Sequence, residues 1–136
     1  MKLREVMSSP AVTIDVNTPV SAATRAMKSD DIGDVIVVSG GEFRGLLTDR
    51  DLAVRVVALG RNPDMTAAGE VYSRDVHGLE PDDDVDLAVE LMREHAVRRV
   101  PIVDGTSPVG MVTLGDLVER DGHPAPGDVS RSDRNA

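Results

Sequence analysis

The sequence contains no cysteine and no tryptophan, and it has only one tyrosine and one phenylalanine among its 136 residues. The absence of cysteine excludes disulfide bonds, thiolate metal sites and thiol redox chemistry. The scarcity of aromatic side chains leaves almost nothing on which unpaired bases could stack. Positive charge is also in deficit, because the net charge is −9, whereas nucleic-acid binding usually draws on clustered lysine and arginine. We therefore expect no nucleic-acid partner.

Long hydrophobic runs are missing as well. No apolar stretch approaches the roughly 20 residues that a membrane-spanning helix needs. The first residues, MKLREVMSS, lack the apolar centre of a secretion signal. These features predict a cytoplasmic protein with no membrane partner.

The chain does contain an internal duplication, the feature to seek before local structure. An ungapped offset of 65 residues aligns residues 5–55 with residues 70–120 and gives 14 identities in 51 positions, among them Glu5/Glu70 and Ser8/Ser73. The motif Gly-x-x-Thr-x-x-Asp-Leu occurs in both copies, at 45–52 and at 110–117. We divide the chain into a first repeat (1–60), a linker (61–69), a second repeat (70–121) and a tail (122–136) that we expect to be disordered.

Each repeat shows the element order β-α-β-β-α. A short strand (11–14 or 76–79) precedes a helix whose Val, Ala and Met recur at the spacing of a buried face. A hairpin follows, with strands at 35–38 and 44–48 in one copy and at 100–103 and 109–113 in the other. Thr18 and the run Asp82–Asp84 are expected to cap the first helix of each copy. The second helix of the first copy is expected to run from Asp49 to before Gly60, with Leu52, Val56 and Leu59 inward.

This order predicts much of the geometry. A strand-helix-strand crossover makes the first two strands parallel, and the hairpin adds the third strand antiparallel. A three-stranded sheet with helices on one face buries too little surface to be stable alone. We therefore expect an α/β (α+β-like) fold of two repeats with small three-stranded sheets, packed about a pseudo-twofold axis.

The repeated motif has two interpretations. In the first, Thr48 and Asp51, and likewise Thr113 and Asp116, form capping boxes at helix starts. In the second, the Thr hydroxyl binds a phosphate at a strand-to-helix junction, where amides and the helix dipole favour an anion. The carboxylate one turn along then accepts from ribose hydroxyls, and the Gly that begins the strand leaves room for the ligand. The spacing alone is compatible with both.

With these motifs, the strand VPIVD (100–104) and the run GLLTDRDLAVRVVALGRNP (45–63), the sequence resembles tandem CBS domains, also called a Bateman module, over residues 1–120. In that family the Thr contacts phosphate and the Asp contacts the ribose of an adenosine ligand in clefts between the repeats. The resemblance implies these roles for Thr48, Asp51, Thr113 and Asp116. The implied ligand is AMP, ADP, ATP or S-adenosylmethionine, and no cofactor is required.

The two copies differ just before the first strand of the hairpin. The second repeat has Arg98 and Arg99 where the first has Gly33 and Asp34, and the resemblance places these positions near the ligand phosphates. An arginine pair neutralises phosphate charge, whereas Asp34 repels it. We expect one strong and one weak or vacant site. The alternative is that both arginines form surface salt bridges.

The adenine is expected to lie against aliphatic side chains and strand backbone, because aromatic residues are so few. Our candidates for this contact are Val12, Ile14, Ile36, His77 and Pro101. For His77 a half-buried position in a strand is the stronger expectation. His95 is expected at the end of a helix.

We predict a regulatory module, not an enzyme, because no nucleophile–base pair or metal cluster stands out. A bound adenosine ligand would change the angle between the repeats, a form of energy sensing that a protein partner detects in trans. The resemblance also implies a homodimer that covers apolar helix faces. Two alternatives remain: a structural or interaction protein without a ligand, and a metal-dependent nucleotide hydrolase that uses Asp82–Asp84.

Overall fold

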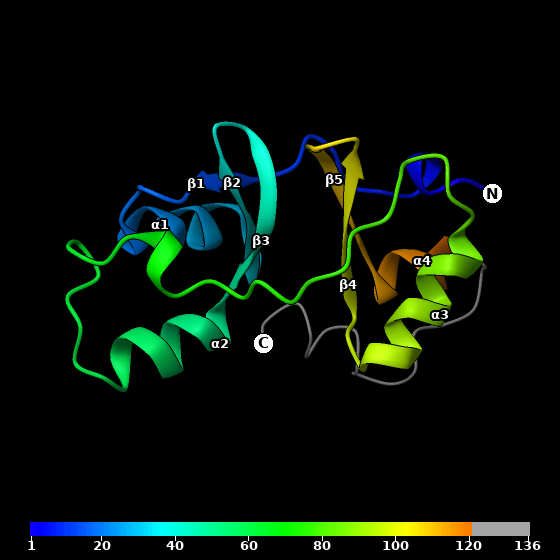
Figure 1. The fold of residues 1–136 in the computed structure, drawn as a ribbon. Helices are drawn as coiled ribbons and strands as arrows, with labels where there is room; N and C mark the ends of the chain where they lie inside the picture. Colours follow the sequence, from blue (N-terminus) through cyan, green and yellow to red (C-terminus); the bar gives the residue numbers. More distant parts are fainter. Residues whose placement is uncertain (121–136) are drawn as a thin grey trace. The chain divides into compact units, whose positions relative to one another are not determined.

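The structure, a computed structural model, describes residues 1–120, which fold into two units (Figure 1). The first unit is Val12–Val76, and the second unit consists of Met1–Ala11 together with residues 77–120. The tail predicted at 122–136 lies outside the described residues. Within residues 1–120 no helix combines the length and the apolar character needed to cross a membrane.

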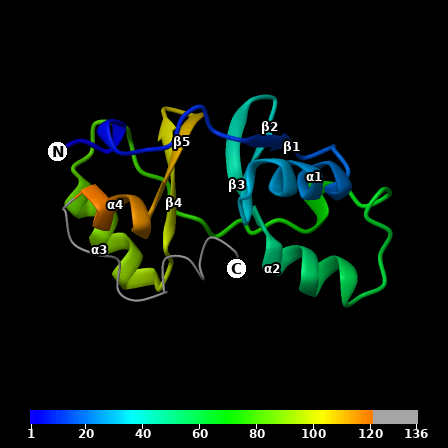
Figure 2. The same ribbon diagram turned by 180° about the vertical axis from the view of Figure 1, so that it is seen from behind.

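The first unit has the predicted strand–helix–hairpin order. Its elements are β1 (Thr13–Asp15), α1 (Val20–Asp30), β2 (Asp34–Ser39), β3 (Glu42–Thr48), α2 (Asp49–Leu52), the π-helical turn η2 (Ala53–Val57) and the 3-10 helix η3 (Ala68–Glu70). As predicted, β1 pairs with β2 in parallel and β3 pairs with β2 antiparallel. Figures 1 and 2 show α1 and α2 on the same face of this sheet. The core between them contains Val20, Met27, Val35, Leu47 and Val56.

The second unit has a smaller sheet than predicted. It contains η1 (Leu3–Glu5), α3 (Val85–His95), β4 (Arg99–Asp104), β5 (Ser107–Thr113) and α4 (Leu114–Arg120), and only β4 and β5 pair as strands. The strand expected at 76–79 is reduced to one parallel bridge between Leu79 and Ile102. Prolines explain the loss: in the first unit Ile36 N and Val16 N donate to this ladder, and Pro101 and Pro81 stand at the equivalent positions without an N–H.

The sequence repeat and the folded unit do not coincide, because the start of the first repeat belongs to the second unit, and the linker with residues 70–76 belongs to the first unit. In the second unit Leu3 N donates to Asp83 O, and in the first unit Ala68 N donates to Thr18 O, two bonds related by the 65-residue offset. Leu3 is fully buried in the core of the second unit, and Ala68 is fully buried in the core of the first. Each core is therefore complete only with a segment from outside its own repeat.

Two local predictions are wrong. Helix α1 begins at Val20 with Pro19 at the N-cap position, so Thr18 does not cap it; instead Thr66 O and Pro63 O accept from the first amides of the helix. Leu59 is 69% exposed rather than inward. The π-helical turn η2 lengthens the repeat of the helix, so the residue three positions after the buried Val56 no longer faces the core.

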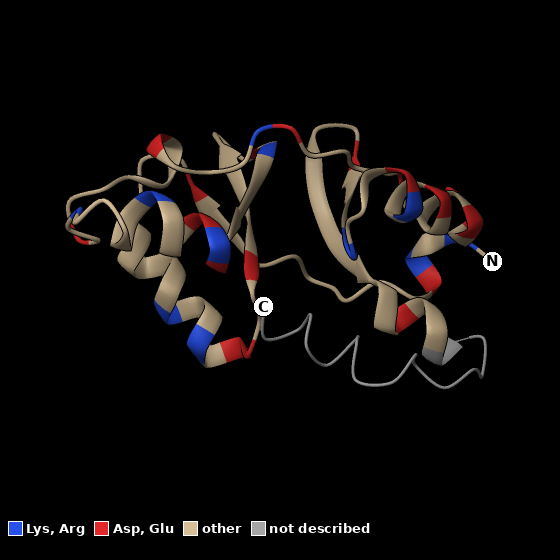
Figure 3. Ribbon diagram, turned by 90° about the horizontal axis from the view of Figure 1, so that it is seen from below, with Lys and Arg blue, Asp and Glu red and all other residues tan. Residues whose placement is uncertain are grey.

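Ion pairs hold the N-terminal segment of the second unit. Asp82 Oδ1 accepts from Arg4 Nε at 2.7 Å and lies 3.6 Å from Lys2 Nζ, and Asp84 lies 3.3 Å from the N-terminal ammonium. Figure 3 shows acidic and basic segments adjoining near the N-terminus. The hydrogen bond from Arg4, then the charges of Arg4 and Lys2, lower the pKa of Asp82 below its ordinary 3.8.

We expect this attachment to weaken in acid. Because the pKa of Asp82 is lower in the folded state, its stabilisation is present above pH 3.8 and is lost as the pH falls through the folded value. Asp82→Asn should melt at a lower temperature than the wild type at neutral pH, and the gap should close below about pH 4. Thermal melts across this range test the prediction, which a gap independent of pH contradicts.

Candidate functional site

Both copies of the repeated motif form capping boxes at a strand-to-helix junction. In the first unit Asp51 N donates to Thr48 Oγ1 at 3.0 Å, and Thr48 N donates to Asp51 Oδ2 at 3.0 Å. In the second unit Asp116 N donates to Thr113 Oγ1 at 3.1 Å, and Thr113 N donates to Asp116 Oδ2 at 2.9 Å. The capping interpretation is therefore correct in both copies, even though an aspartate reaches back less far than a glutamate.

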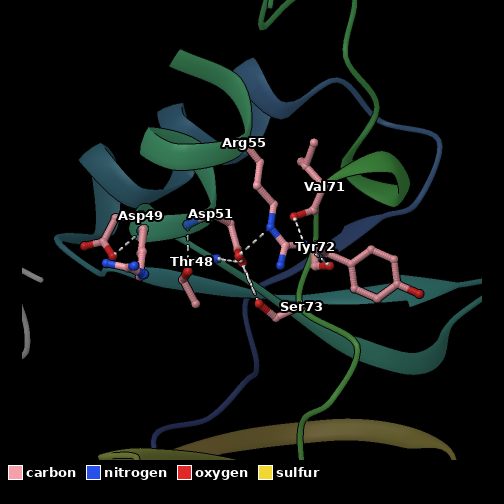
Figure 4. A network of polar contacts seen from close by, with 8 residues as sticks. Thr48, Asp49, Asp51, Arg55, Val71, Tyr72 and Ser73 are labelled. Atoms are coloured by element: carbon pink, nitrogen blue, oxygen red, sulfur yellow. Dashed lines mark hydrogen bonds and ion pairs between the residues drawn. The ribbon is translucent and has the colours of Figure 1, made fainter. Parts of the chain in front are cut away.

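The two carboxylates have different surroundings. Asp51 is 6% exposed, and Ser73 Oγ donates to it at 2.9 Å from Oδ1 and 3.0 Å from Oδ2. Arg55 Nε lies 3.8 Å from Oδ1 and adds a cation on the same side (Figure 4). Asp116 is half-buried. Within residues 1–120 the hydroxyl of Ser8, the counterpart of Ser73, makes no hydrogen bond to Asp116.

The glycine of each motif makes room for protein rather than for a ligand. A Cβ added to Gly45 would lie 2.2 Å from Ser73 O, and one added to Gly110 would lie 2.7 Å from Ser8 O. The exchanged segments cross β3 and β5 at these points, where Ser73 pairs with Leu46 and Ser8 pairs with Met111. The expectation of ligand space beside these glycines is wrong, because backbone fills it.

The hairpin register brings the charged residues at the start of β2 and β4 to the junctions. Arg99 opens β4 and pairs in register with Thr113, whereas Asp34 opens β2 and pairs with Thr48. The carbonyl of Arg98 accepts from Leu114 N at the start of α4. A cationic side chain thus lies across from one motif threonine, and a buried carboxylate lies across from the other.

The candidates for the adenine contact divide between the two units: Val12, Ile14 and Ile36 belong to the first, and His77 and Pro101 belong to the second. Ile14 belongs to the core of the first unit, and Val12 packs against that core. Ile36 and Pro101 are equivalent positions of β2 and β4 and are both buried. His77 is exposed and outside any strand, so the expectation of a half-buried strand histidine is wrong. Its ring stacks on that of His95, with centroids 4.3 Å apart, and His95 ends α3 as predicted.

The run Asp82–Asp84 is occupied by structural contacts. Asp84 caps α3 by accepting from Asp86 N at 2.9 Å, and Asp83 accepts from Glu80 N at 2.8 Å. Asp82 binds Arg4. Nowhere in the described part of the chain do three or more His, Asp or Glu side chains gather so that they could hold a metal.

Sequence reasoning missed Ser73 and the contacts of Arg55. Arg55 Nη1 donates to the carbonyls of Val71 and Tyr72, each at 3.3 Å, and so fastens the segment that carries Ser73. Figure 4 shows Ser73 and Arg55 converging on the Asp51 carboxylate. The identity of Ser8 and Ser73 in the repeat was the available signal, but it does not say which carboxylate either serine meets.

Two repeated α/β units, each with a hydroxyl and a carboxylate at a capped junction, define a tandem-repeat α/β module. The chain belongs to the CBS-domain family, whose model matches residues 3–58 and 68–123. It is therefore a CBS-domain pair, as the sequence resemblance predicted.

Relatives of similar length support this assignment. The chain is 37% identical over 115 residues to the CBS domain-containing protein YhcV of Bacillus subtilis, covering 85% of this chain and 81% of that protein. It is 30% identical over 116 residues to Hypoxic response protein 1 of Mycobacterium tuberculosis, covering 84% and 80%. Neither relative is named for a catalytic activity.

Two solved structures show the same fold. The structure of Hypoxic Response Protein I with two coordinated zinc ions has a TM-score of 0.81 at 28% identity and covers 88% of this chain and 98% of that chain. The CBS domain pair of protein MJ0100 in complex with 5′-methylthioadenosine and S-adenosyl-L-methionine has a TM-score of 0.76 at 26% identity. It covers 90% of this chain and 96% of that chain.

Proposed function

We propose that this CBS pair is a cytoplasmic sensor that binds an adenosine ligand, such as AMP, ADP, ATP or S-adenosylmethionine, and signals to a protein partner in trans. The binding groups are those of the motif: Thr113 for phosphate and Asp116 for ribose in the second unit, and Thr48 and Asp51 in the first. The complex of the MJ0100 pair with two adenosine compounds supports this ligand class. Zinc is not part of the proposal.

The observation that carries the proposal is the junction of the second unit. Thr113 Oγ1 accepts from Asp116 N, so its own proton can be donated to a phosphate. Asp116 uses Oδ2 for the cap, and among the described residues no hydrogen bond to its Oδ1 is formed, which leaves an acceptor for ribose hydroxyls. Arg99 lies across from Thr113 and supplies positive charge for the phosphate. The Asp116 amide is already used by the cap, so in this proposal side chains hold the phosphate.

Calorimetric titration of protein verified to be ligand-free tests this function. We expect one of the four adenosine compounds to bind, and we expect Asp116→Asn to weaken binding about 10- to 100-fold, since a hydrogen bond to a charged group is lost. Asn keeps one oxygen for the cap, so the melting temperature should change little. Exposed Glu90, on α3 of the same unit, provides the control Glu90→Gln, which should bind normally. Absence of heat with all four compounds contradicts the proposal.

One alternative is supported by a specific observation. Both capping boxes are complete without a ligand, as in a structural or interaction pair that has lost its binding role. This alternative predicts that Asp116→Ala costs about 1 kcal/mol of stability, as a lost cap does, and that no adenosine compound raises the melting temperature of the wild type.

We also propose a homodimer that covers the outer face of α2 and η2. Val54, Val57 and Leu59 are exposed there, with Val57 at 74%, and apolar side chains grouped on a surface favour association. Val57→Asp should convert the dimer to a monomer in size-exclusion chromatography with light scattering. Leu87→Asp, on an exposed position of α3, should remain a dimer. A monomeric wild type contradicts this prediction.

A further inference from the structure

Asp51 and Asp116 occupy equivalent positions in the two motifs, but only the Asp51 carboxylate is covered by another side chain. Ser73 Oγ lies within hydrogen-bond distance of both Asp51 oxygens, at 2.9 and 3.0 Å, and Asp51 is 6% exposed. A hydroxyl has one proton to donate, so Ser73 shares it between the two oxygens. Thr48 N donates to Oδ2 as well. A ribose diol that reached Asp51 would need the same acceptors.

The backbone that carries Ser73 is firmly held. Ser73 N donates to Leu46 O at 2.8 Å, and Leu46 N donates to Ser73 O at 3.1 Å. Arg55 donates to the two carbonyls that precede Ser73. Opening of the Asp51 carboxylate therefore requires rotation of one serine side chain rather than displacement of the segment.

In the second unit the backbone of Ser8 is paired in the same way, but its hydroxyl does not contact the motif carboxylate. Ser8 N donates to Met111 O and Met111 N donates to Ser8 O, as at Ser73 and Leu46. Among residues 1–120 no hydrogen bond joins the Ser8 side chain to Asp116, which is half-buried. Ser8 and Ser73 are thus a matched pair in which only one serine meets the carboxylate.

We infer that Ser73 is a gate on the first binding junction: its hydroxyl competes with the ligand's ribose diol for Asp51, so the ligand binds first at Asp116. This inference rests on the proposed function and assigns an order to its two junctions. The charges opposite the two threonines also favour binding at the second junction first, because Arg99 faces Thr113 and Asp34 faces Thr48. Because Ser73 must rotate before the ligand can reach Asp51, the ligand binds later and more weakly at the first junction.

Calorimetry with AMP, which carries the diol, tests the order. We expect Asp116→Asn to weaken the tighter binding step about 10- to 100-fold and Asp51→Asn to change it less than about threefold. In the Asp116→Asn background, Ser73→Ala should strengthen the remaining binding about tenfold. Ser73→Thr, which keeps the hydroxyl, and Ser8→Ala, the matched control, should not. With 2′-deoxy-AMP the gain from Ser73→Ala should shrink, because half of the diol is missing.

The outcomes separate the two proposals. If Asp51→Asn removes the tighter step and Asp116→Asn spares it, the inference is wrong while the sensing function stands. The inference is also wrong if Ser73→Ala, shown to be folded by its melting curve, leaves the affinity of the Asp116→Asn protein unchanged or lowers it. If none of the four adenosine compounds binds to the wild type, the proposed function fails, and the inference fails with it.

Discussion

Gly45→Ala is expected to destabilise the first unit by roughly 3 kcal/mol or more. A Cβ at this position would lie 2.2 Å from Ser73 O and 3.0 Å from the Tyr72 ring. The carbonyl cannot move away without breaking the pair of hydrogen bonds between Ser73 and Leu46. The loss is a large part of the about 5–15 kcal/mol that stabilises a typical domain, so the melting temperature should fall by roughly 10 °C.

Substitutions at two other glycines give a comparison for the loss of stability expected from Gly45→Ala. Gly110→Ala should cost less, because a Cβ there meets Ser8 O at 2.7 Å and the flexible end of the Met7 side chain. Gly40→Asn is the control: an added Cβ meets nothing within 4 Å, and Asn tolerates the positive φ of 58°. Thermal and denaturant unfolding should rank the three in this order. Equal stability of Gly45→Ala and Gly40→Asn would show that Ser73 does not cross β3 at Gly45.

Leu3→Ala is expected to destabilise the second unit by about 2–5 kcal/mol, the usual cost of removing a buried leucine. Leu3 is fully buried in a core with Met92, Val112 and Leu117, although it lies more than 80 residues before them in the sequence. Hydrogen exchange should accelerate in β4 and β5 and stay slow in β2 and β3, because the affected core belongs to the second unit.

Leu87→Ala is the matched control for this prediction. Leu87 lies on α3 of the same unit but is 46% exposed, so the same substitution should cost less than about 1 kcal/mol. Faster exchange in the first unit with Leu3→Ala would mean instead that the N-terminal segment supports the repeat in which it is encoded.

The hairpins and helix faces could be predicted because their signals are local. The spacing of Val20, Ala23 and Met27 indicated the buried face of α1, and all three are buried. The Gly turns located the antiparallel pairs β2–β3 and β4–β5. The missing strand before α3 was also readable in principle, since Pro81 and Pro101 remove the two donors that the ladder needs.

The candidate site was predicted in part. The spacing Thr-x-x-Asp indicated a cap in each copy, and both caps form. Arg99 pairs in register with Thr113, as the hairpin turn dictates, and its contact with a ligand phosphate, which the resemblance implies, stays a prediction. The purpose of Gly45 was misjudged, because nothing local in the sequence shows that another segment crosses there. Binding of an adenosine ligand by these residues stays a prediction.

By itself the sequence determined the duplication, the family, most of the order of elements and the positions of the two strand-to-helix junctions, because each rests on residues close together in the chain. Only the tertiary structure decided which core receives Leu3 and Ala68, and which carboxylate Ser73 meets. A duplicated sequence offers each segment two equivalent places to pair, and local preferences are the same in both. The pairing that forms depends on how residues far apart in the sequence pack together. Here this packing exchanges the two segments and gives the two identical motifs different surroundings.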